Sequence, residues 1–211
     1  MEKLYPREKN SISQLIKLAT AIDSSSNTKK MRTASPLAQG KKHVAKEATT
    51  GYYTTNVRCG HHELIKFINS EAPSSEFIEC SEEVFNEHHQ IKYYATSFPN
   101  PVSDRELHVS IITKIIDYRT IIIVSVPCLI EEKARNVHPD RVRAEILSMY
   151  KLTRISDNET RVEFYAEFDL GGYFPRWLIN RELPKYMSPP TMWQEHFQHQ
   201  RRLNQLTSED G

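Results

Sequence analysis

Six consecutive segments rich in β-branched and aromatic residues, followed by one long helical stretch, constrain the fold more than any other feature of this chain. The segments read SEFIECSE, HQIKYYATSF, ELHVSIITKII, RTIIIVSVP, RVRAEILSMYKLTRI and TRVEFYAEFDL, and their composition favours strands. Turn-forming residues such as those at 99–101 and 156–159 separate several of them. Because short connections join antiparallel neighbours, we expect an antiparallel sheet.

A further strand and two helical segments complete the expected domain. YYTTNVRC predicts the strand, and HHELIKFINS directly after it predicts a short helix. Residues 173–206 are helical in pattern, with Pro175 in the first turn, where a missing N–H costs little. Pro184 and the pair Pro189-Pro190 must kink or interrupt this stretch. This order predicts an α+β fold, in which a curved antiparallel sheet of about seven strands wraps around a long C-terminal helix.

The N-terminal part differs from the rest in charge. Residues 1–46 hold ten Lys/Arg against three Asp/Glu, a net charge of +7, whereas residues 47–211 hold 18 against 24, a net charge of −6. Apolar residues at helical spacing predict an amphipathic helix near the N-terminus, and the lysine-rich residues after it are typical of a linker. We therefore divide the chain into an N-terminal amphipathic helix (1–23), a basic flexible linker (24–46), one folded domain (47–207) and a disordered tail (208–211).

Composition also narrows the cellular setting and the partners. Cys59, Cys80 and Cys128 are widely spaced and form no CxxC pair, which favours a reducing compartment. The longest apolar run, IIIVSVPCLI, is too short to span a bilayer, so we expect a cytoplasmic monomer. The basic residues 1–46 could contact an anionic membrane peripherally. Residues 47–211 lack a basic patch with interleaved aromatics, so we expect no nucleic-acid partner.

The sequence offers little support for catalysis or metal binding. The histidines at 61–62 and 88–89 lack HExxH spacing and a cysteine partner, so we interpret them as surface or strand-end residues and expect no metal. There is no GxSxG string and no phosphate-binding glycine loop, and the whole chain holds only six glycines. We therefore expect no cofactor and no enzymatic activity.

Alternation along the strands indicates room on one face of the sheet. Residues 162–169 alternate between an apolar set and a second set that is mostly charged. Ala144, Ser148 and Ala166 are small members of the apolar face, and one helix fills a concave sheet at interior density only if large side chains close the gap. Two interpretations stay open: a cavity, or an ordinary core closed by aromatic residues such as Tyr150 and Phe164.

Four strings between Tyr93 and Leu203 resemble the steroidogenic-acute-regulatory-related lipid-transfer (START) domain. They are PVSDRE from residue 101, VRAE from 142, TRVEFYAEFDLGG from 160 and FPRWLIN from 174, in the matching order and spacing. The resemblance covers about half of the chain, and it implies a helix-grip fold that holds one lipid in a tunnel. The matched structural motif positions are Arg105, Arg143, Asp169, Gly171, Gly172, Pro175 and Asn180.

The resemblance implies that loops 97–104 and 127–140, with the C-terminal helix, frame the tunnel mouth. It also implies a lipid or another hydrophobic small molecule as partner, held for transfer or sensing. The candidate lining residues are Leu107, Val109, Ile111, Ala144, Ile146, Ser148, Phe164, Ala166, Phe168, Trp177 and Leu178. Two alternatives stay open: a ligand-free interaction module, and a cyclase or hydrolase of the helix-grip superfamily that uses Ser148, Tyr150 or Thr113.

Two departures from the START pattern bear on the ligand. Sterol-binding members carry an arginine and an acid where this chain has Ile111 and Lys92, so the resemblance does not support a sterol-type ion pair. The segment at 60–75 is short, and one end of the tunnel could be shallow. Asp169 is on the outward-facing set of its strand, so we expect it to accept hydrogen bonds from the turn or to pair with Arg105 or Arg143.

Overall fold

A computed structural model describes residues 13, 29–31, 33, 38–44, 49–70, 77–86, 88–128, 138–172 and 174–209. Within this part of the chain there are ten strands and three helices. The strands are β1 (Lys29–Met31), β2 (Gln39–Val44), β3 (Thr49–Val57), β4 (Phe77–Asn86), β5 (His89–Thr96), β6 (Asp104–Ile115), β7 (Thr120–Pro127), β8 (Arg141–Arg143), β9 (Glu145–Ser156) and β10 (Glu159–Asp169). The helices are α2 (His61–Ser70), α4 (Arg176–Tyr186) and α5 (Pro189–Glu209).

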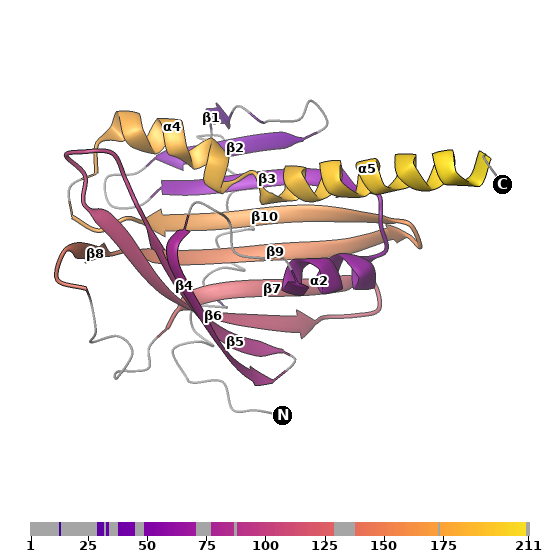
Figure 1. Ribbon diagram of the computed structural model, residues 1–211, viewed down its shortest axis with the longest axis horizontal. Coiled ribbons are helices and arrows are strands. Elements are labelled where there is room, and N and C mark those ends of the chain that lie inside the picture. The colour runs from indigo at the N-terminus through magenta and orange to yellow at the C-terminus, as the bar shows by residue number, and fades with distance from the viewer. Residues whose placement is uncertain are drawn as a thin grey trace.

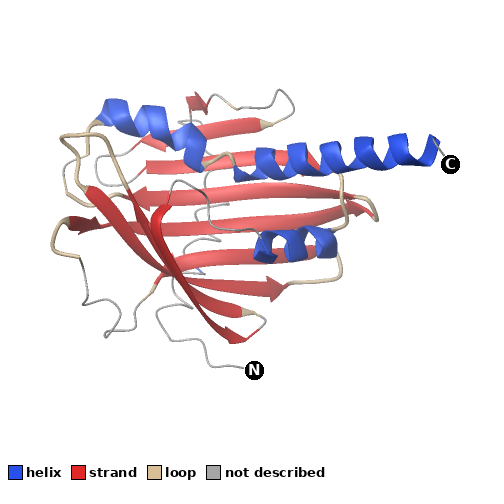
Figure 2. Cartoon of the chain, viewed as in Figure 1, coloured by secondary structure: helices blue, strands red, loops and turns tan. Residues whose placement is uncertain are grey.

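All ten strands belong to one sheet, with the order β1-β2-β3-β10-β9-β7-β6-β5-β4 and with β8 beside β6. Neighbours are antiparallel except for the parallel β6–β8 pair. The end of the sheet formed by β4, β5 and β6 curves in front of the other strands (Figure 1). The three helices lie on the concave side of the sheet (Figure 2). The predicted α+β architecture of a curved antiparallel sheet with C-terminal helices is therefore confirmed.

The sheet is larger than the sequence indicated. β1 and β2 fall inside residues 24–46, which we expected to form a flexible linker, and β8 is separated from β9 at Ala144. Lysine-rich composition disfavours strands locally, but β3 offers an edge to which Gln39–Val44 pair in register. Met31 is only 2% exposed, so β1 also contributes to the core. The predicted N-terminal helix lies outside the described residues except for Ser13.

The C-terminal helical stretch is interrupted, as the prolines predicted. α4 ends at Tyr186 and α5 begins at Pro189, because the residue before a proline is disfavoured in helical conformation. Pro184 lies inside α4 and does not end it. Pro175 is the N-cap of α4, and its carbonyl accepts the N–H groups of Leu178 and Ile179 at 2.9 and 3.1 Å. α5 continues to Glu209, two residues into the tail that we expected to be disordered.

Two clusters of buried residues lie between the sheet and the helices. Under α4, Phe164 and Ala166 pack with Leu183 and Met187. Under α5 and α2, Leu152 and Val162 pack with Leu64, Trp193 and Phe197. Burial of each large apolar side chain contributes about 1.5–3 kcal/mol relative to exposure. The helices are therefore attached to the sheet by apolar contacts along much of its concave face.

A third cluster occupies the opposite face of the sheet. Tyr165 and Met149 alternate with the inward residues of β10 and β9, and both are buried with Val124 and Val126. We expected the Tyr165 face to be solvent-like because three of its four residues in 162–169 are acidic. The structure differs there, since Tyr165 is only 3% exposed and its ring lies 4.7 Å from that of Tyr52.

Candidate ligand-binding site

Small residues form a row across four adjacent strands on the concave face. Gly51 of β3 pairs with Ala166 of β10, Ala166 with Ser148 of β9, and Ser148 with Ser125 of β7. Directly paired residues point to the same face of a sheet. Because Ala166 packs in the cluster with α4, the row faces the helices. The side chains of this row therefore occupy little volume between the centre of the sheet and the helices.

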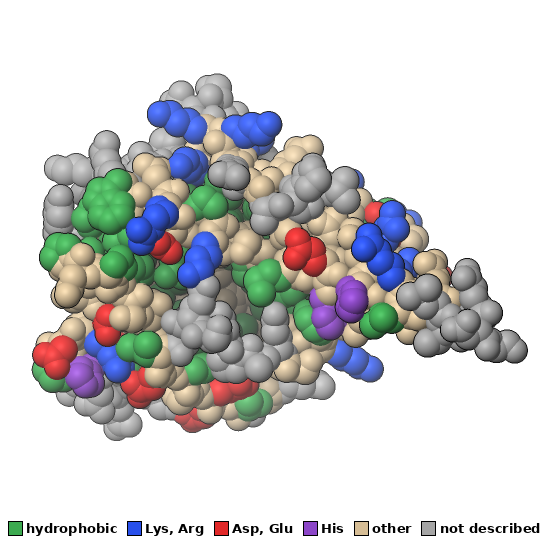
Figure 3. All heavy atoms as spheres, turned by 45° about the horizontal axis from the view of Figure 1, so that its top comes forward, with side chains coloured by type: hydrophobic (Ala, Val, Ile, Leu, Met, Phe, Trp, Pro, Cys, Tyr) green, Lys and Arg blue, Asp and Glu red, His purple; other side chains and the backbone are tan. Residues whose placement is uncertain are grey.

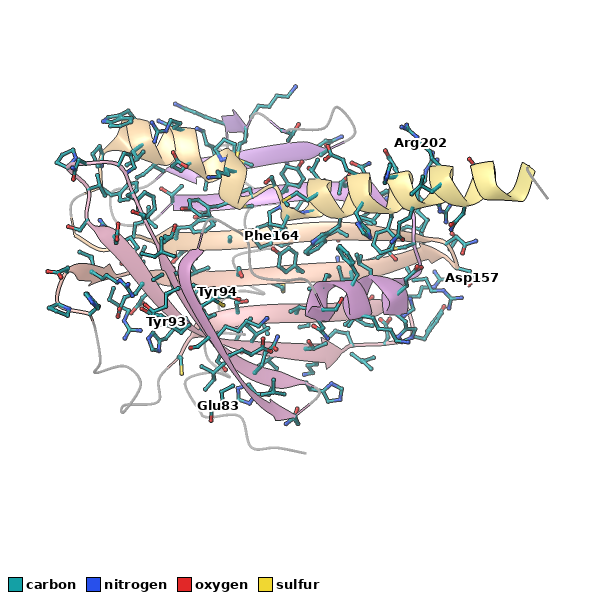
Figure 4. The ribbon with its side chains drawn as sticks, in the orientation of Figure 1. Glu83, Tyr93, Tyr94, Asp157, Phe164 and Arg202 are labelled. Atoms are coloured by element: carbon teal, nitrogen blue, oxygen red, sulfur yellow. The ribbon has the colours of Figure 1, made fainter. Side chains whose placement is uncertain are left out.

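Aromatic residues border the row on the side toward α5. Tyr53, Phe164, Tyr150 and Ile123 are paired across the same four strands, two residues along from the row. The rings of Phe164 and Tyr150 stack with centroids 4.1 Å apart and an interplanar angle of 7°, and Trp193 of α5 lies 5.0 Å from Tyr150. In Figure 4, Phe164 projects from β10 on the side that carries the helices. This aromatic border is held by both the sheet and α5.

Large residues also border the row on the side toward α4. Phe168 pairs with Ile146, and the ring of Tyr186 in α4 lies 6.2 Å from Phe168. Phe164 and Phe168 are four residues apart along β10, which corresponds to about 13 Å between the two borders. We define the candidate groove as this row of small residues, taken as its floor, together with the two borders of large residues.

Met187, in the break between α4 and α5, packs against Gly51 at the β3 end of the row. A Cβ added to Gly51 would lie 2.8 Å from the sulfur of Met187, so the glycine admits the methionine against the sheet. Met187 is completely buried. Towards β7, Ser148 is buried whereas Ser125 is partly exposed. The row is therefore buried at its β3 end and partly exposed at its β7 end.

Most of the predicted lining residues are buried or partly buried in the structure. Ile111 and Ile146 are partly exposed, and the following are buried: Leu107, Val109, Ala144, Ser148, Phe164, Ala166, Phe168 and Leu178. Trp177 does not join them. It is 59% exposed, and the guanidinium of Arg181 lies 5.3 Å from its ring. The helical pattern alone did not show which side of α4 faces the sheet.

Sequence reasoning missed several residues of the groove. Gly51, Ser125 and Met187 contribute to its floor and cover, and Trp193 to its side. Ser125 could have been found, because it is a polar residue on the same face of its strand as Ile121 and Ile123. The contribution of Met187 depends on where the helix breaks over the sheet, and a sequence pattern does not reveal that.

Polar groups lie on the concave face at the β4–β5 hairpin. Lys92 pairs with the inward residue Val109, and its ammonium lies 3.4 Å from the carboxylate of Glu82, with 15% of the lysine side chain exposed. Tyr94 is on the same face of β5, and burial raises the pKa of its phenol. Ile111 and Lys92 thus replace the sterol-type pair with an apolar residue and a lysine that already has a partner.

The predicted structural motif residues meet at the corner between β10 and α4. Arg105 is 2% exposed, and burial lowers its pKa. Its guanidinium donates to the carbonyls of Leu170 and Gly171 at 2.6 and 3.3 Å. The rings of Phe98 and Phe174 lie 6.0 and 5.2 Å from it. Arg105 therefore links the end of β10 to loop 97–104, one of the two loops expected to frame the tunnel mouth. Only part of the other loop, 127–140, is described.

Asp169 has a structural contact at this corner. Its carboxylate accepts the N–H of Gly171 at 2.9 Å, in agreement with the turn interaction that we expected. Gly171 and Gly172 have φ values of 63° and 58°, and a Cβ on Gly171 would collide with the carbonyl oxygen of Arg143. Asn180 accepts a hydrogen bond from Lys42 of β2 at 2.6 Å. The corner thus joins β10, β8, α4 and β2.

A buried carboxylate on the opposite face was not predicted. Glu106 is 0% exposed and lies 3.6 Å from Arg143. It also accepts the N–H of His138 at 3.1 Å. Arg141 donates to Tyr93 and Glu79 at 2.5 and 2.6 Å. These contacts hold β8 beside β6, so they position the strands rather than the groove.

The curved sheet, the interrupted C-terminal helix and the corner define the helix-grip fold of START domains. A scan against protein-family models and a search of curated proteins find no match. Among solved structures, the chain is similar to the human StarD13 (DLC2) lipid transfer and protein localization domain, with a TM-score of 0.58, 16% identity, and 83% of this chain and 88% of that chain covered. Human StAR-related lipid transfer protein 5 matches with a TM-score of 0.63, 13% identity, and 83% and 91% covered.

A bacterial structure gives the same result. The STAR-related lipid transfer protein from Xanthomonas axonopodis matches with a TM-score of 0.63, 12% identity, and 82% of this chain and 99% of that chain covered. The likeness therefore extends over nearly the whole of that START structure. Within the described residues, no helix is long and apolar enough to cross a membrane.

Proposed function

We propose that this chain binds a single hydrophobic ligand, such as a phospholipid or a sterol, between the sheet and the C-terminal helices, for transfer or sensing. The observation that carries this proposal is the row of small residues across β3, β10, β9 and β7, bordered by aromatic side chains beneath α4 and α5. The START fold adds support, since the similar solved structures are named as lipid transfer proteins.

The chemistry of the groove suits a ligand with a long apolar part. Burying apolar surface contributes about 25 cal/mol per Å², and the aromatic borders and the isoleucines of β6 and β9 supply such surface. Ser125 and Ser148 on the floor offer hydroxyl groups, and Lys92 and Tyr94 offer polar groups at the β4–β5 end. We retain ten of the predicted lining residues and leave out Trp177, because it is 59% exposed beside Arg181.

The direct test is to ask what the purified chain carries. Residues 1–211 are expressed, purified and analysed by native mass spectrometry, and the lipids are then extracted and identified. We expect a population with the added mass of one lipid, which is lost on organic extraction. A chain with no added mass that also fails to bind fluorescent phospholipid or sterol would favour a ligand-free interaction module instead.

A further inference from the structure

A polar cavity lies at the edge of β3, outside the proposed lipid groove. Pairing between β2 and β3 begins at Gln39 and Thr54, so β3 extends beyond β2 as far as Val57. The cavity beside this edge has a volume of about 500 Å³, which is within the usual range for small-molecule sites. Its lining includes Thr55, Arg58, Glu159, Glu163, Gln194 and Gln198.

Two buried polar atoms in this lining have no hydrogen-bond partner. Thr55 is 4% exposed and Gln194 of α5 is 3% exposed. The hydroxyl oxygen of Thr55 and the amide oxygen of Gln194 are both unpaired. Buried polar atoms are normally satisfied by protein, water or a ligand. The Gln194 oxygen requires a donor, so a matching ligand would carry O–H or N–H groups on this side.

Arginines line this cavity and a neighbouring one. A second cavity of about 340 Å³ shares Arg58 and Gln198 with the first and adds Arg201 and Arg202. Figure 3 shows basic side chains gathered on this part of the molecule, and Figure 4 shows Arg202 on the C-terminal half of α5. Arginine pairs with phosphate in a bidentate manner. The two joined cavities therefore present guanidinium groups beside unpaired polar atoms.

The two carboxylates of the lining already have partners. Glu159 accepts the side-chain N–H of Asn56 at 3.0 Å, and Glu163 lies 2.9 Å from the ammonium of Lys151. They can still accept hydrogen bonds from hydroxyl groups, but they would repel a ligand that is anionic throughout. A ligand that places anionic groups at the arginines and hydroxyl groups at the glutamates matches both sets.

We propose that this edge cavity binds a phosphorylated polyol, with its phosphates at the arginines and its hydroxyls at Thr55, Gln194 and Glu159. The inference is independent of the lipid groove, since Trp193 and Phe197 pack α5 toward the groove side. The same chemistry is available from a free polyol phosphate or from the head group of an inositol lipid in a membrane. Calorimetry and vesicle binding distinguish these two sources.

The first experiment titrates the full chain with inositol 1,4,5-trisphosphate, with inorganic phosphate and with myo-inositol. We expect the trisphosphate to bind with one site per chain, and more tightly than either fragment. The double variant Arg201→Gln/Arg202→Gln should weaken binding at least tenfold. The double variant Lys114→Gln/Arg119→Gln removes the same charge from the exposed β6–β7 hairpin, three strands from β3 in the sheet, and should change the affinity less than twofold.

Thr55→Val tests the built part of the site, because it removes a hydroxyl while preserving shape and charge. We expect it to weaken binding several-fold without lowering the unfolding temperature, because the hydroxyl that it removes is buried and unpaired. Co-sedimentation with phosphatidylcholine vesicles, with and without phosphatidylinositol 4,5-bisphosphate, shows which source of the ligand the cavity uses. Binding to the vesicles that contain the inositol lipid supports a membrane head group. Binding of the soluble trisphosphate alone supports a free polyol phosphate. The proposal is overturned if neither binds, if Thr55→Val changes nothing, or if an acidic peptide binds with the same arginine dependence and the trisphosphate does not.

Discussion

His108 is a partly buried base whose surroundings oppose its charge. Burial is the main cause that lowers the pKa of its imidazole, Arg143 lowers it further, and Glu106 acts in the opposite direction. The ring lies 4.7 Å from that of Tyr93, and its Nε2 atom is buried without a hydrogen-bond partner. The folded protein therefore holds this histidine neutral at pH values where the unfolded chain would protonate it.

This linkage predicts a loss of stability in acid. At pH values between the lowered pKa of folded His108 and the ordinary histidine pKa of 6.5, the unfolded chain binds more protons than the folded chain. The free energy of unfolding therefore falls as the pH decreases through about 6.5. Chemical denaturation of His108→Gln between pH 8 and pH 5 should show a weaker pH dependence than the unmodified chain. The exposed control His199→Gln should retain the original slope. Equal slopes for both variants would show that His108 does not contribute.

Some individual contacts could be predicted and others could not. Asp169, Gly171 and Gly172 belong to a short string whose interactions are local, so their roles in the turn followed from the sequence. Glu106 and Ser125 depend on partners from distant strands. Their roles require the register of the sheet, which alternation alone does not fix.

The turn between β10 and α4 connects the sheet to the C-terminal helices. Both of its glycines have positive φ, where a Cβ costs about 1–2 kcal/mol. Only a Cβ at Gly171 would also collide with the Arg143 backbone, whereas at Gly172 the nearest atom is 4.0 Å away. An alanine at Gly172 would thus introduce backbone strain alone, whereas an alanine at Gly171 would introduce both strain and a steric collision.

We expect Gly172→Ala to lower the free energy of unfolding by about 1 kcal/mol and Gly171→Ala by at least about 2 kcal/mol. Urea denaturation followed by tryptophan fluorescence measures both variants under the same conditions. Equal losses would argue against the close approach of the turn to β8.

The strands β1 and β2 predict that the folded domain begins before residue 47. Met31 and Ala38 are buried with Leu183 and Met187 of the C-terminal stretch, and Lys42 bonds to Asn180. Deletion of residues 1–46 should therefore lower the free energy of unfolding by at least about 2 kcal/mol relative to deletion of residues 1–28, which retains both strands. Equal stability of the two truncated chains, measured by urea denaturation, would show that residues 29–46 act as a linker after all.

At the scale of the whole molecule, the order of elements from β3 onward was predictable because it depends on local signals, whereas β1, β2 and the separation of β8 from β9 were not predicted. Turn residues delimit the strands, and the prolines at 189–190 mark the break between α4 and α5. The candidate groove was only partly predictable. Its floor is a row across four strands, which requires the register of the sheet. The residues that cover it depend on which side of α4 faces the sheet. The sequence does not reveal that side, so Trp177 was assigned to the lining and Met187 was not.

The most direct test of the lipid proposal is the binding of a fluorescent phospholipid to two tryptophan variants of β9. Ser148→Trp places a large side chain in the row of small residues, whereas Glu145→Trp places the same side chain at an exposed position on the opposite face of β9. Circular dichroism first establishes that both variants are folded. We predict that Ser148→Trp lowers the binding affinity at least tenfold and that Glu145→Trp binds like the unmodified chain. Undiminished binding by folded Ser148→Trp would contradict a ligand site between the sheet and the helices.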